Sequence, residues 1–164
     1  MKVIENFLPA QEFDTLKSVM TGTSFPWFLY KGVVGDDDYY QFCHTFYRHL
    51  RPNTSEHHLS IINPILKKLN VVSLLRIKAN LLYKTSKIIK HGYHTDFEPD
   101  LNNKTSIFYV NTNNGYTSFK NGRKVKSKEN TLVEFDSKLE HSGTTCTDKE
   151  YRMIINFNYY KKKK

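Results

Sequence analysis

LLRIKANLLY, residues 74–83, is the first of six short apolar runs that decide the fold of this chain. Each run has the length and the Val, Ile, Leu, Phe and Tyr content of a β-strand, and polar turn residues separate it from the next. The other five runs are Lys87 to Tyr93, Thr105 to Asn111, Gly115 to Phe119, Thr131 to Phe135 and Tyr151 to Tyr159. Six strands joined by turns predict a mainly β protein, and we expect a double-stranded β-helix, or jelly roll, over about residues 71–160.

Two turn signals lie between these runs. Asn113-Asn114-Gly115 and Asn121-Gly122 combine the two residue types that adopt positive φ at little steric cost. We therefore expect tight turns at both places, joining antiparallel strands.

The first 70 residues predict a supporting layer of helices. Val3 to Phe7 has the pattern of a short strand, and apolar residues at helical spacing follow Pro9, which suits a first helical turn. A second helix is expected over Leu59 to Leu69, although Pro64 disfavours an unbroken one. The aromatic and glycine-containing stretch from Phe25 to Tyr47 fits a loop or hairpin better than a long helix.

Length and composition limit the class of protein. The 164 residues, 38% of them hydrophobic and 14% aromatic, predict one domain with a packed core over residues 1–164. The two cysteines, Cys43 and Cys146, form no C-x-x-C pair, which argues against a zinc ribbon or a disulfide scaffold and favours a reducing cytoplasm. No apolar run approaches the length of a membrane span, so a soluble protein without a membrane partner is expected.

The chain is basic, with a formal net charge of +9, and it ends in Lys161 to Lys164. Such a balance favours anionic partners, among them nucleic acid, phosphates and small dicarboxylates. We interpret the lysine tail as a solvated end, because flexible ammonium groups bind phosphate without reading sequence.

His94-Thr95-Asp96 is the first chemical motif, and it follows a predicted strand. Residues i and i+2 of a strand point to the same face, so His94 and Asp96 can converge on one metal ion. His141 lies 45 positions after Asp96 (141 − 96) and offers a second imidazole. Two imidazoles and one carboxylate form the facial triad that leaves open positions on a non-haem iron.

Arg152 lies 11 positions after His141 (152 − 141), on the last predicted strand. Its planar guanidinium can pair with a carboxylate through two hydrogen bonds. An arginine pointing into a barrel is costly unless it is paired, so beside the triad Arg152 is a candidate for binding an acidic ligand.

These residues resemble the Fe(II)/2-oxoglutarate-dependent oxygenase superfamily, and within it the prolyl-4-hydroxylase-like branch and its small phage-encoded members. Five features in order carry the resemblance. They are the H-x-D of His94 and Asp96, the strand Ile107 to Asn111, the turn Asn114 to Phe119, His141-Ser142-Gly143, and the basic residue Arg152. The segment from Val3 to Pro9 is also similar to the start of many members, whereas residues 21–70 carry no motif of the family.

The resemblance implies a jelly-roll dioxygenase with His94, Asp96 and His141 as catalytic Fe(II) ligands and Arg152 as the partner of 2-oxoglutarate. It further implies Tyr109 as a second contact to that cosubstrate, while Tyr83 and Asn80 are candidates for the same pocket. The reaction would use O2, with ascorbate as a further candidate cofactor, and would release succinate as a substrate C–H is hydroxylated.

The sequence departs from the branch at two positions. Asn114 stands where the branch has the first glycine of its turn, which adds a side chain where substrate approaches. Arg152 stands where many collagen-type members carry Lys, a change that keeps carboxylate binding.

Three functions follow as hypotheses. The first is hydroxylation of a protein or peptide, as in the prolyl hydroxylases, in the host cytoplasm if the chain is phage-encoded. The second is oxidation of nucleic acid or a modified base, which the net charge favours; members of the demethylase branch, however, usually carry a second arginine soon after the first, and Met153 to Asn158 contains none. The third is a jelly-roll binding module without catalysis.

Two further groups of residues have weaker predicted roles. Asp36-Asp37-Asp38 lacks the spacing of a calcium loop and fits a solvated turn. Glu98 and Asp100 follow the H-x-D motif closely and are expected to lie in a loop at the rim of the pocket.

Overall fold

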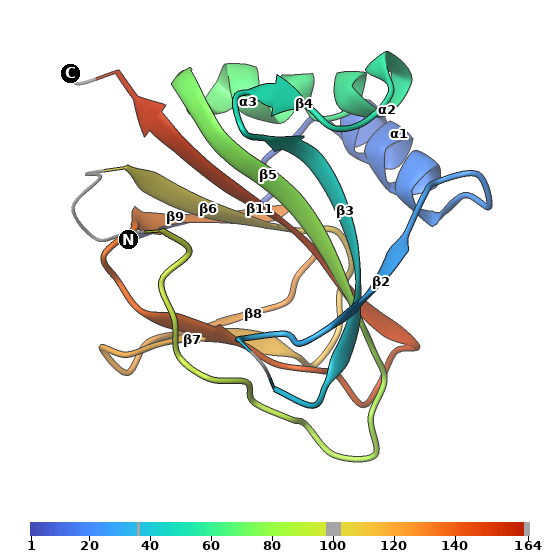
Figure 1. The fold of residues 1–164 in the computed structure, drawn as a ribbon, viewed down its shortest axis with the longest axis vertical. Helices are drawn as coiled ribbons and strands as arrows, with labels where there is room; N and C mark the ends of the chain where they lie inside the picture. Colours follow the sequence, from blue (N-terminus) through green and yellow to red (C-terminus); the bar gives the residue numbers. More distant parts are fainter. Residues whose placement is uncertain (36, 98–102, 163–164) are drawn as a thin grey trace.

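The computed structural model describes residues 1–35, 37–97 and 103–162, and Figure 1 shows their arrangement. These described residues form two antiparallel sheets and three short helices (Figure 1). The predicted mainly β, jelly-roll-like architecture is confirmed. Lys163 and Lys164 of the lysine tail, and Asp36, Glu98 and Asp100, lie outside the described residues.

The larger sheet has eight strands in the order β1-β9-β6-β11-β5-β3-β2, with β4 paired to β3. Its strands are β1 (Lys2–Ile4), β2 (Phe28–Lys31), β3 (Tyr40–Arg48), β4 (Arg51–Pro52), β5 (Val71–Tyr83), β6 (Lys104–Tyr109), β9 (Thr131–Asp136) and β11 (Tyr151–Lys161). The smaller sheet has the order β10-β7-β8, with β7 (Tyr116–Phe119), β8 (Lys124–Lys126) and β10 (His141–Gly143).

The first 70 residues contribute more strand than the sequence predicted. Strands β1 to β4 all belong to the larger sheet, and β3 pairs along β5 from Phe42↔Leu81 to Arg48↔Arg76. The stretch from Phe25 to Tyr47 is the predicted hairpin, formed by β2 and β3. The sheet therefore extends well beyond the expected boundary at residue 71.

Three helices cover one face of the larger sheet (Figure 1). They are α1 (Ala10–Thr21), α2 (Glu56–Ser60) and α3 (Asn63–Leu69). The single helix predicted over residues 59–69 is wrong. The chain breaks between Ser60 and Asn63, because Pro64 has no N–H to continue a hydrogen-bonded helix and instead occupies the first turn of α3.

Lys87 to Tyr93, predicted as a strand, forms no named strand. It runs irregularly beside β10 with isolated bridges at Lys90↔Thr144 and, just beyond it, His94↔His141. The turn at Asn121-Gly122 is confirmed, with Gly122 at φ +87°. No positive φ occurs at Asn113-Asn114-Gly115, so the expected use of positive φ is wrong at this place.

Close packing, and not a positive φ, explains why residue 115 is a glycine. A Cβ at this position would lie 2.7 Å from Cδ of Arg152 and 2.7 Å from the carbonyl oxygen of Thr145. Such distances are shorter than atoms tolerate, so only glycine lets the chain pass this close to the Arg152 side chain just before β7 begins.

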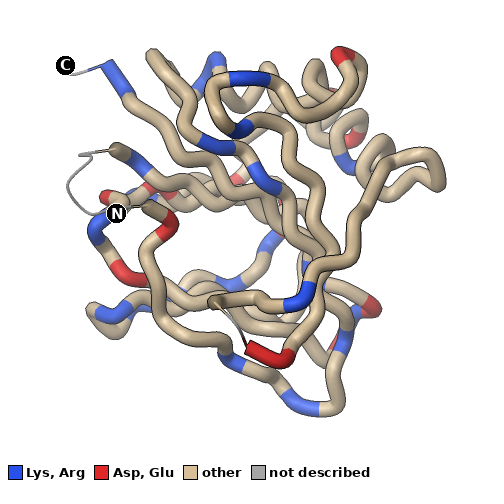
Figure 2. Tube along the Cα trace, viewed as in Figure 1, with Lys and Arg blue, Asp and Glu red and all other residues tan. Residues whose placement is uncertain are grey.

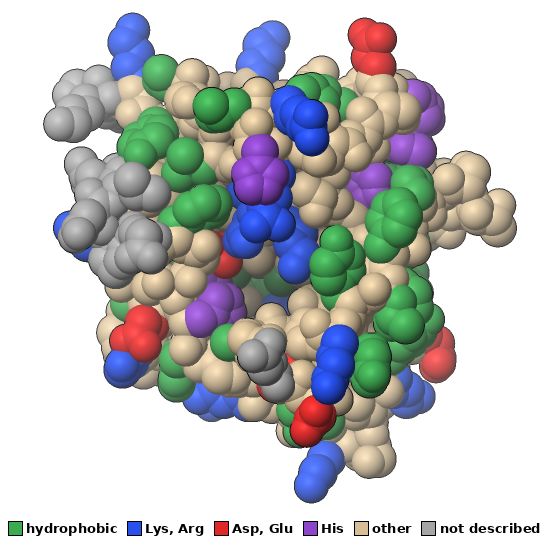
Figure 3. Space-filling view, in the orientation of Figure 1, with side chains coloured by type: hydrophobic (Ala, Val, Ile, Leu, Met, Phe, Trp, Pro, Cys, Tyr) green, Lys and Arg blue, Asp and Glu red, His purple; other side chains and the backbone are tan. Residues whose placement is uncertain are grey.

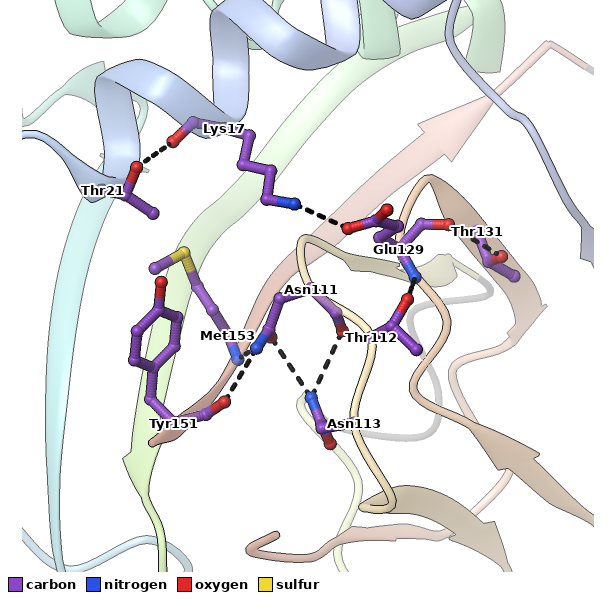
Figure 4. A network of polar contacts seen from close by, with 9 residues as sticks. All are labelled: Lys17, Thr21, Asn111, Thr112, Asn113, Glu129, Thr131, Tyr151 and Met153. Carbon is purple, nitrogen blue, oxygen red and sulfur yellow. Dashed lines mark hydrogen bonds and ion pairs between the residues drawn. The ribbon is translucent and has the colours of Figure 1, made fainter. Parts of the chain in front are cut away.

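Asn111 fixes the chain between β6 and β7. Its Nδ2 donates to the carbonyl of Tyr151 at 2.8 Å, and its Oδ1 accepts from the Met153 amide at 2.9 Å and from Nδ2 of Asn113 (Figure 4). The Lys17–Glu129 ion pair at 2.6 Å connects α1 to the nearby loop (Figure 4). The two Asn111 bonds to Tyr151 and Met153 hold the start of β11, and with it Arg152, at a set position.

The residues of β11 alternate between two environments. Met153, Ile155, Phe157 and Tyr159 are buried in the larger apolar core, which also contains residues from α1 and α3. The even-numbered positions face the space between the two sheets, where a smaller apolar cluster includes Phe119, Val133 and Ile154. A polar cavity occupies the rest of that space.

Candidate metal and cosubstrate site

Backbone pairing brings His94 and His141 together. Each amide donates to the other residue's carbonyl at 3.0 Å, and the ring centroids are 4.6 Å apart. Asp96 lies two residues further along the chain, as the H-x-D spacing predicted. One ligand atom from each of His94, Asp96 and His141 lies within 4.8 Å of the others, and this is the only such cluster found in the described part of the chain.

The Asp96 carboxylate is buried and held from two sides. Nη2 of Arg76 lies 2.8 Å from Oδ1, and Nδ2 of Asn158 donates to Oδ2 at 2.9 Å. Burial alone would raise the pKa of Asp96, but Arg76, His141 and the Asn158 amide outweigh it and lower the pKa to about 2. Asp96 is thus an ionised, oriented carboxylate at neutral pH.

The His141 imidazole is kept neutral. Its ring is buried, which lowers its pKa against a smaller opposing effect of Asp96, and its Nδ1 has no hydrogen-bond partner among the described residues. A neutral imidazole is the form that binds a metal ion. With the partly exposed His94, the donor set suits a divalent cation such as Fe(II).

Arg152 is a buried cation, with 1% of its surface exposed. Its Nε donates to Oγ of Ser127 at 2.7 Å and its Nη2 donates to Oγ1 of Thr117 at 3.1 Å. No carboxylate of a described residue pairs with it. A buried guanidinium held only by hydroxyl groups can accept an acidic ligand from the cavity that it lines.

Tyr109 lies behind this arginine. The Tyr109 side chain is fully buried, and its hydroxyl donates to Oγ1 of Thr117 at 2.9 Å. Thr117, not Tyr109, lines the cavity. Contact between Tyr109 and a cosubstrate therefore stays a prediction, and the observed contact positions Thr117 against Arg152.

The triad and Arg152 open into one cavity of about 270 Å³. In Figure 3 it is a hollow near the middle of the face, with Lys and Arg side chains along its wall and His side chains above and below. Leu82, Ile107 and Ile154 supply apolar lining. The site thus joins a metal-binding end, a cationic end and a partly apolar wall.

Asn80 and Tyr83 occupy different places. Asn80 lines the cavity and accepts from Sγ of Cys43 at 3.4 Å. Tyr83 is 59% exposed and lines a separate depression with Thr85 and Glu150. The two residues are an odd number of positions apart on one strand, so they point to opposite faces.

Sequence reasoning missed Arg76 and Asn158, and it expected Thr117 only to pack. The alternation of side chains along a strand could have indicated Arg76 and Asn158. Polar residues at alternate positions interrupt the otherwise apolar runs of β5 and β11, and they mark one face of each strand as polar. Those positions are Arg76, Lys78 and Asn80 on β5, and Arg152, Asn156 and Asn158 on β11. Thr117 has no comparable signal, yet it lies between Arg152 and Tyr109.

Two residues outside the predicted ligand set have structural roles. Asp37 accepts from the amides of Val33, Val34 and Tyr39; these bonds lower its pKa against the effect of burial. It therefore fixes the turn between β2 and β3. Asn114 bonds to Thr147 and Asp148 and does not line the cavity.

Comparison of the fold with solved structures finds 2-oxoglutarate/Fe(II) oxygenases. An oxidoreductase of the 2OG-Fe(II) oxygenase family from Burkholderia pseudomallei is 14% identical, with 93% of this chain and 83% of that chain covered and a TM-score of 0.65. The viral collagen prolyl hydroxylase of Paramecium Bursaria Chlorella virus-1 is 16% identical, with 97% and 89% covered and a TM-score of 0.60.

A prolyl hydroxylase from Trichoplax adhaerens, solved with a hypoxia inducible factor peptide fragment, is 13% identical, with 97% and 82% covered and a TM-score of 0.63. At these identities the likeness shows the fold. No protein-family profile and no curated protein matches the chain. Among the described residues, no helix combines the length and apolarity needed to cross a membrane.

Proposed function

We propose that this chain is an Fe(II)- and 2-oxoglutarate-dependent dioxygenase that hydroxylates a C–H bond of a protein or peptide. The observation that carries the proposal is the meeting, in one cavity, of two imidazoles, an ionised carboxylate and a buried arginine. Three protein ligands would leave open positions on a bound Fe(II) for a chelating cosubstrate and O2. The prolyl hydroxylases that share this fold, one of them solved with a peptide, support a peptide substrate.

Bound Fe(II), with 2-oxoglutarate and O2, would supply the oxidising chemistry that converts 2-oxoglutarate to succinate and CO2 and a substrate C–H to C–OH. The residues of the chain bind and orient the reactants. His94, Asp96 and His141 hold the metal, and Arg76 and Asn158 keep the Asp96 carboxylate ionised and aimed. Arg152 pairs with the distal carboxylate of 2-oxoglutarate, while the apolar lining excludes water.

Oxidation of nucleic acid is the second candidate, and the net charge of +9 favours it. Figure 2 shows Lys and Arg positions spread over both sheets and outnumbering Asp and Glu. On β11, however, the cavity-facing positions after Arg152 are Ile154 and Asn156, so no second arginine joins the first. A substrate-dependent turnover that falls steeply with salt would favour this alternative over a peptide.

The central test is His94→Ala. Loss of a metal ligand is expected to weaken Mn(II) binding more than about a hundredfold, because even partners outside the ligand set contribute about 10–100-fold. Succinate release with Fe(II), 2-oxoglutarate and ascorbate should be lost, while the melting temperature changes little because His94 is partly exposed.

His57→Ala is the matched control, since His57 is an exposed imidazole on α2. It should bind Mn(II) and release succinate like the parent. Parental metal binding and turnover in His94→Ala would show that the triad assignment is wrong.

A further inference from the structure

Five polar residues line the cavity along β5 and β11, and three of them are held by a partner in the described part of the chain. Arg76 pairs with Asp96, Asn80 accepts from Cys43, and Arg152 donates to Ser127 and Thr117. The remaining two are Lys78 and Asn156.

Lys78 and Asn156 are direct cross-strand neighbours in the β5–β11 ladder. Directly opposed residues on antiparallel strands share a face, so both side chains lie on the same wall of the cavity. Asn156 is 8% exposed, and its buried Oδ1 has no hydrogen-bond partner among the described residues. A buried carboxamide oxygen without a partner costs free energy, which a donor on a ligand would recover.

The Lys78 ammonium reaches toward the rim. Its Nζ lies 5.7 Å from the ring centroid of Tyr30, a half-exposed residue of β2, and no carboxylate of a described residue pairs with it. The Cys43 thiol also lies near Lys78, but burial raises the pKa of that thiol, so it stays neutral and leaves the charge of the ammonium uncompensated. The wall thus offers a cation and an amide side by side, away from the hydroxyls that hold Arg152.

The charges on the cavity wall favour an anionic substrate. The described lining contains the cations Arg76, Lys78 and Arg152 but one carboxylate, that of Asp96. If the chain has the proposed function, the positive charge of bound Fe(II) and the negative charge of 2-oxoglutarate cancel each other. The positive excess of the wall then remains for the substrate to neutralise.

We propose that Lys78 and Asn156 are specificity-determining residues and that the substrate is an acidic peptide. A Glu or Asp side chain of the peptide pairs with Lys78, and a peptide N–H donates to Oδ1 of Asn156. A cavity of about 270 Å³ with one ammonium that lacks a carboxylate fits a single acidic side chain, whereas a nucleic-acid backbone is normally tracked by several cations in a groove. This inference rests on the proposed function for the position of the reacting C–H.

The test uses two fluorescent pools of proline-containing peptides, one with Glu beside the proline and the other with Gln at the same places. Binding is measured by anisotropy to the full chain loaded with Mn(II) and 2-oxoglutarate. We expect the Glu pool to bind at least about tenfold more tightly than the Gln pool, as for a charge pair worth about 1.4 kcal/mol. This preference should weaken at high salt.

Lys78→Gln should remove the preference for Glu, and Lys78→Arg should keep it. Lys78→Met also removes the charge and retains the aliphatic part of the side chain, so it replaces Lys78→Gln in this test if the Gln variant folds poorly. Asn156→Ala should weaken the binding of both peptide pools several-fold and leave the ratio of their affinities unchanged. Lys87→Gln removes an exposed lysine outside the cavity lining and should bind both pools like the parent.

Equal binding of the two pools, binding of neither, or an intact preference in both Lys78→Gln and Lys78→Met would overturn the inference. So would a single-stranded oligonucleotide that displaces the Glu pool at concentrations well below those of unlabelled peptide. Separate titrations with Mn(II) and 2-oxoglutarate test the proposed function. If those titrations fail, the peptide titration on the metal-free chain still reports whether Lys78 selects a carboxylate.

Discussion

The two faces of β11 differ in chemistry although they alternate along one strand. Met153, Ile155 and Phe157 are apolar, buried and packed beneath the helices. Arg152 and Asn156, on the other face, are polar and line the cavity. Burial of the first set stabilises the fold, whereas burial of the second set costs free energy until a ligand supplies partners. Fold stability and ligand binding are therefore expected to respond to different substitutions on the same strand.

Arg152→Gln tests the cavity face and should have the largest effect. Loss of the guanidinium is expected to raise the Kd for 2-oxoglutarate by about a hundredfold to a thousandfold, or about 3–4 kcal/mol, as for other buried charge pairs. The free energy of unfolding without ligand should change by no more than about 1 kcal/mol, because the arginine lacks a carboxylate partner in that state. Calorimetric titration and urea unfolding measure the two quantities.

Arg123→Gln is the control for Arg152→Gln, since Arg123 is exposed in the turn between β7 and β8. It should bind 2-oxoglutarate like the parent. Unchanged affinity in Arg152→Gln would remove Arg152 from the site.

Ile155→Ala tests the core face of the same strand. Ile155 is fully buried, so the substitution should lower the free energy of unfolding by about 3 kcal/mol through lost burial and a new cavity. Well below the melting temperature, the Kd for 2-oxoglutarate should stay within about twofold of the parental value. Ile155→Val should cost only about 1 kcal/mol. A large loss of cosubstrate affinity in Ile155→Ala would show that the two faces are coupled.

Acid titration of Asp96 should have the smallest effect. Its pKa is lowered from 3.8 to about 2 in the folded chain. A lowered pKa means that the ionised group stabilises the fold above the unfolded value and that this contribution is lost as pH falls from about 4 to about 2. The contribution is about 2 kcal/mol, at about 1.4 kcal/mol for each pKa unit.

Urea unfolding of the metal-free chain at about pH 5, 3 and 2 measures this loss. Other carboxylates titrate in the same range, so Asp96→Asn is compared with the parent, and it should show a shallower decline. Parallel pH profiles of the two proteins would contradict the role of Arg76 and Asn158 in holding an ionised carboxylate.

Local sequence patterns predicted those parts of the molecule that depend on short spacings. The i, i+2 rule put His94 and Asp96 on one face, and five of the six apolar runs formed strands. The segment from Lys87 to Tyr93 was apolar enough for a strand, but its partner β10 has only three residues and cannot support a ladder. Pairing partners decided the outcome, and these lie far away in the sequence.

The contacts that sequence reasoning missed are also long-range. Arg76 meets Asp96 because β5 and the segment after His94 lie together in the fold, and no motif links the two positions. Likewise, β3 pairs with β5 although residues 21–70 carry no family motif. The alternation of polar and apolar residues along β5 and β11 can be seen in the sequence. Because side chains of a strand alternate between its two faces, this alternation alone assigns Asn80 and Tyr83 to opposite faces.

The mutual hydrogen bonds between His94 and His141 join the two imidazoles through the backbone as well as through any shared ion. A one-residue slip of β10 against β7 would turn His141 to the opposite face, so the site depends on strand register as well as on side chains. Hydrogen exchange of the His94 and His141 amides would therefore report whether a metal ion occupies the triad. Occupation of the triad holds both segments together, and it should slow exchange of these two amide protons with solvent more than it slows exchange in the core of β11.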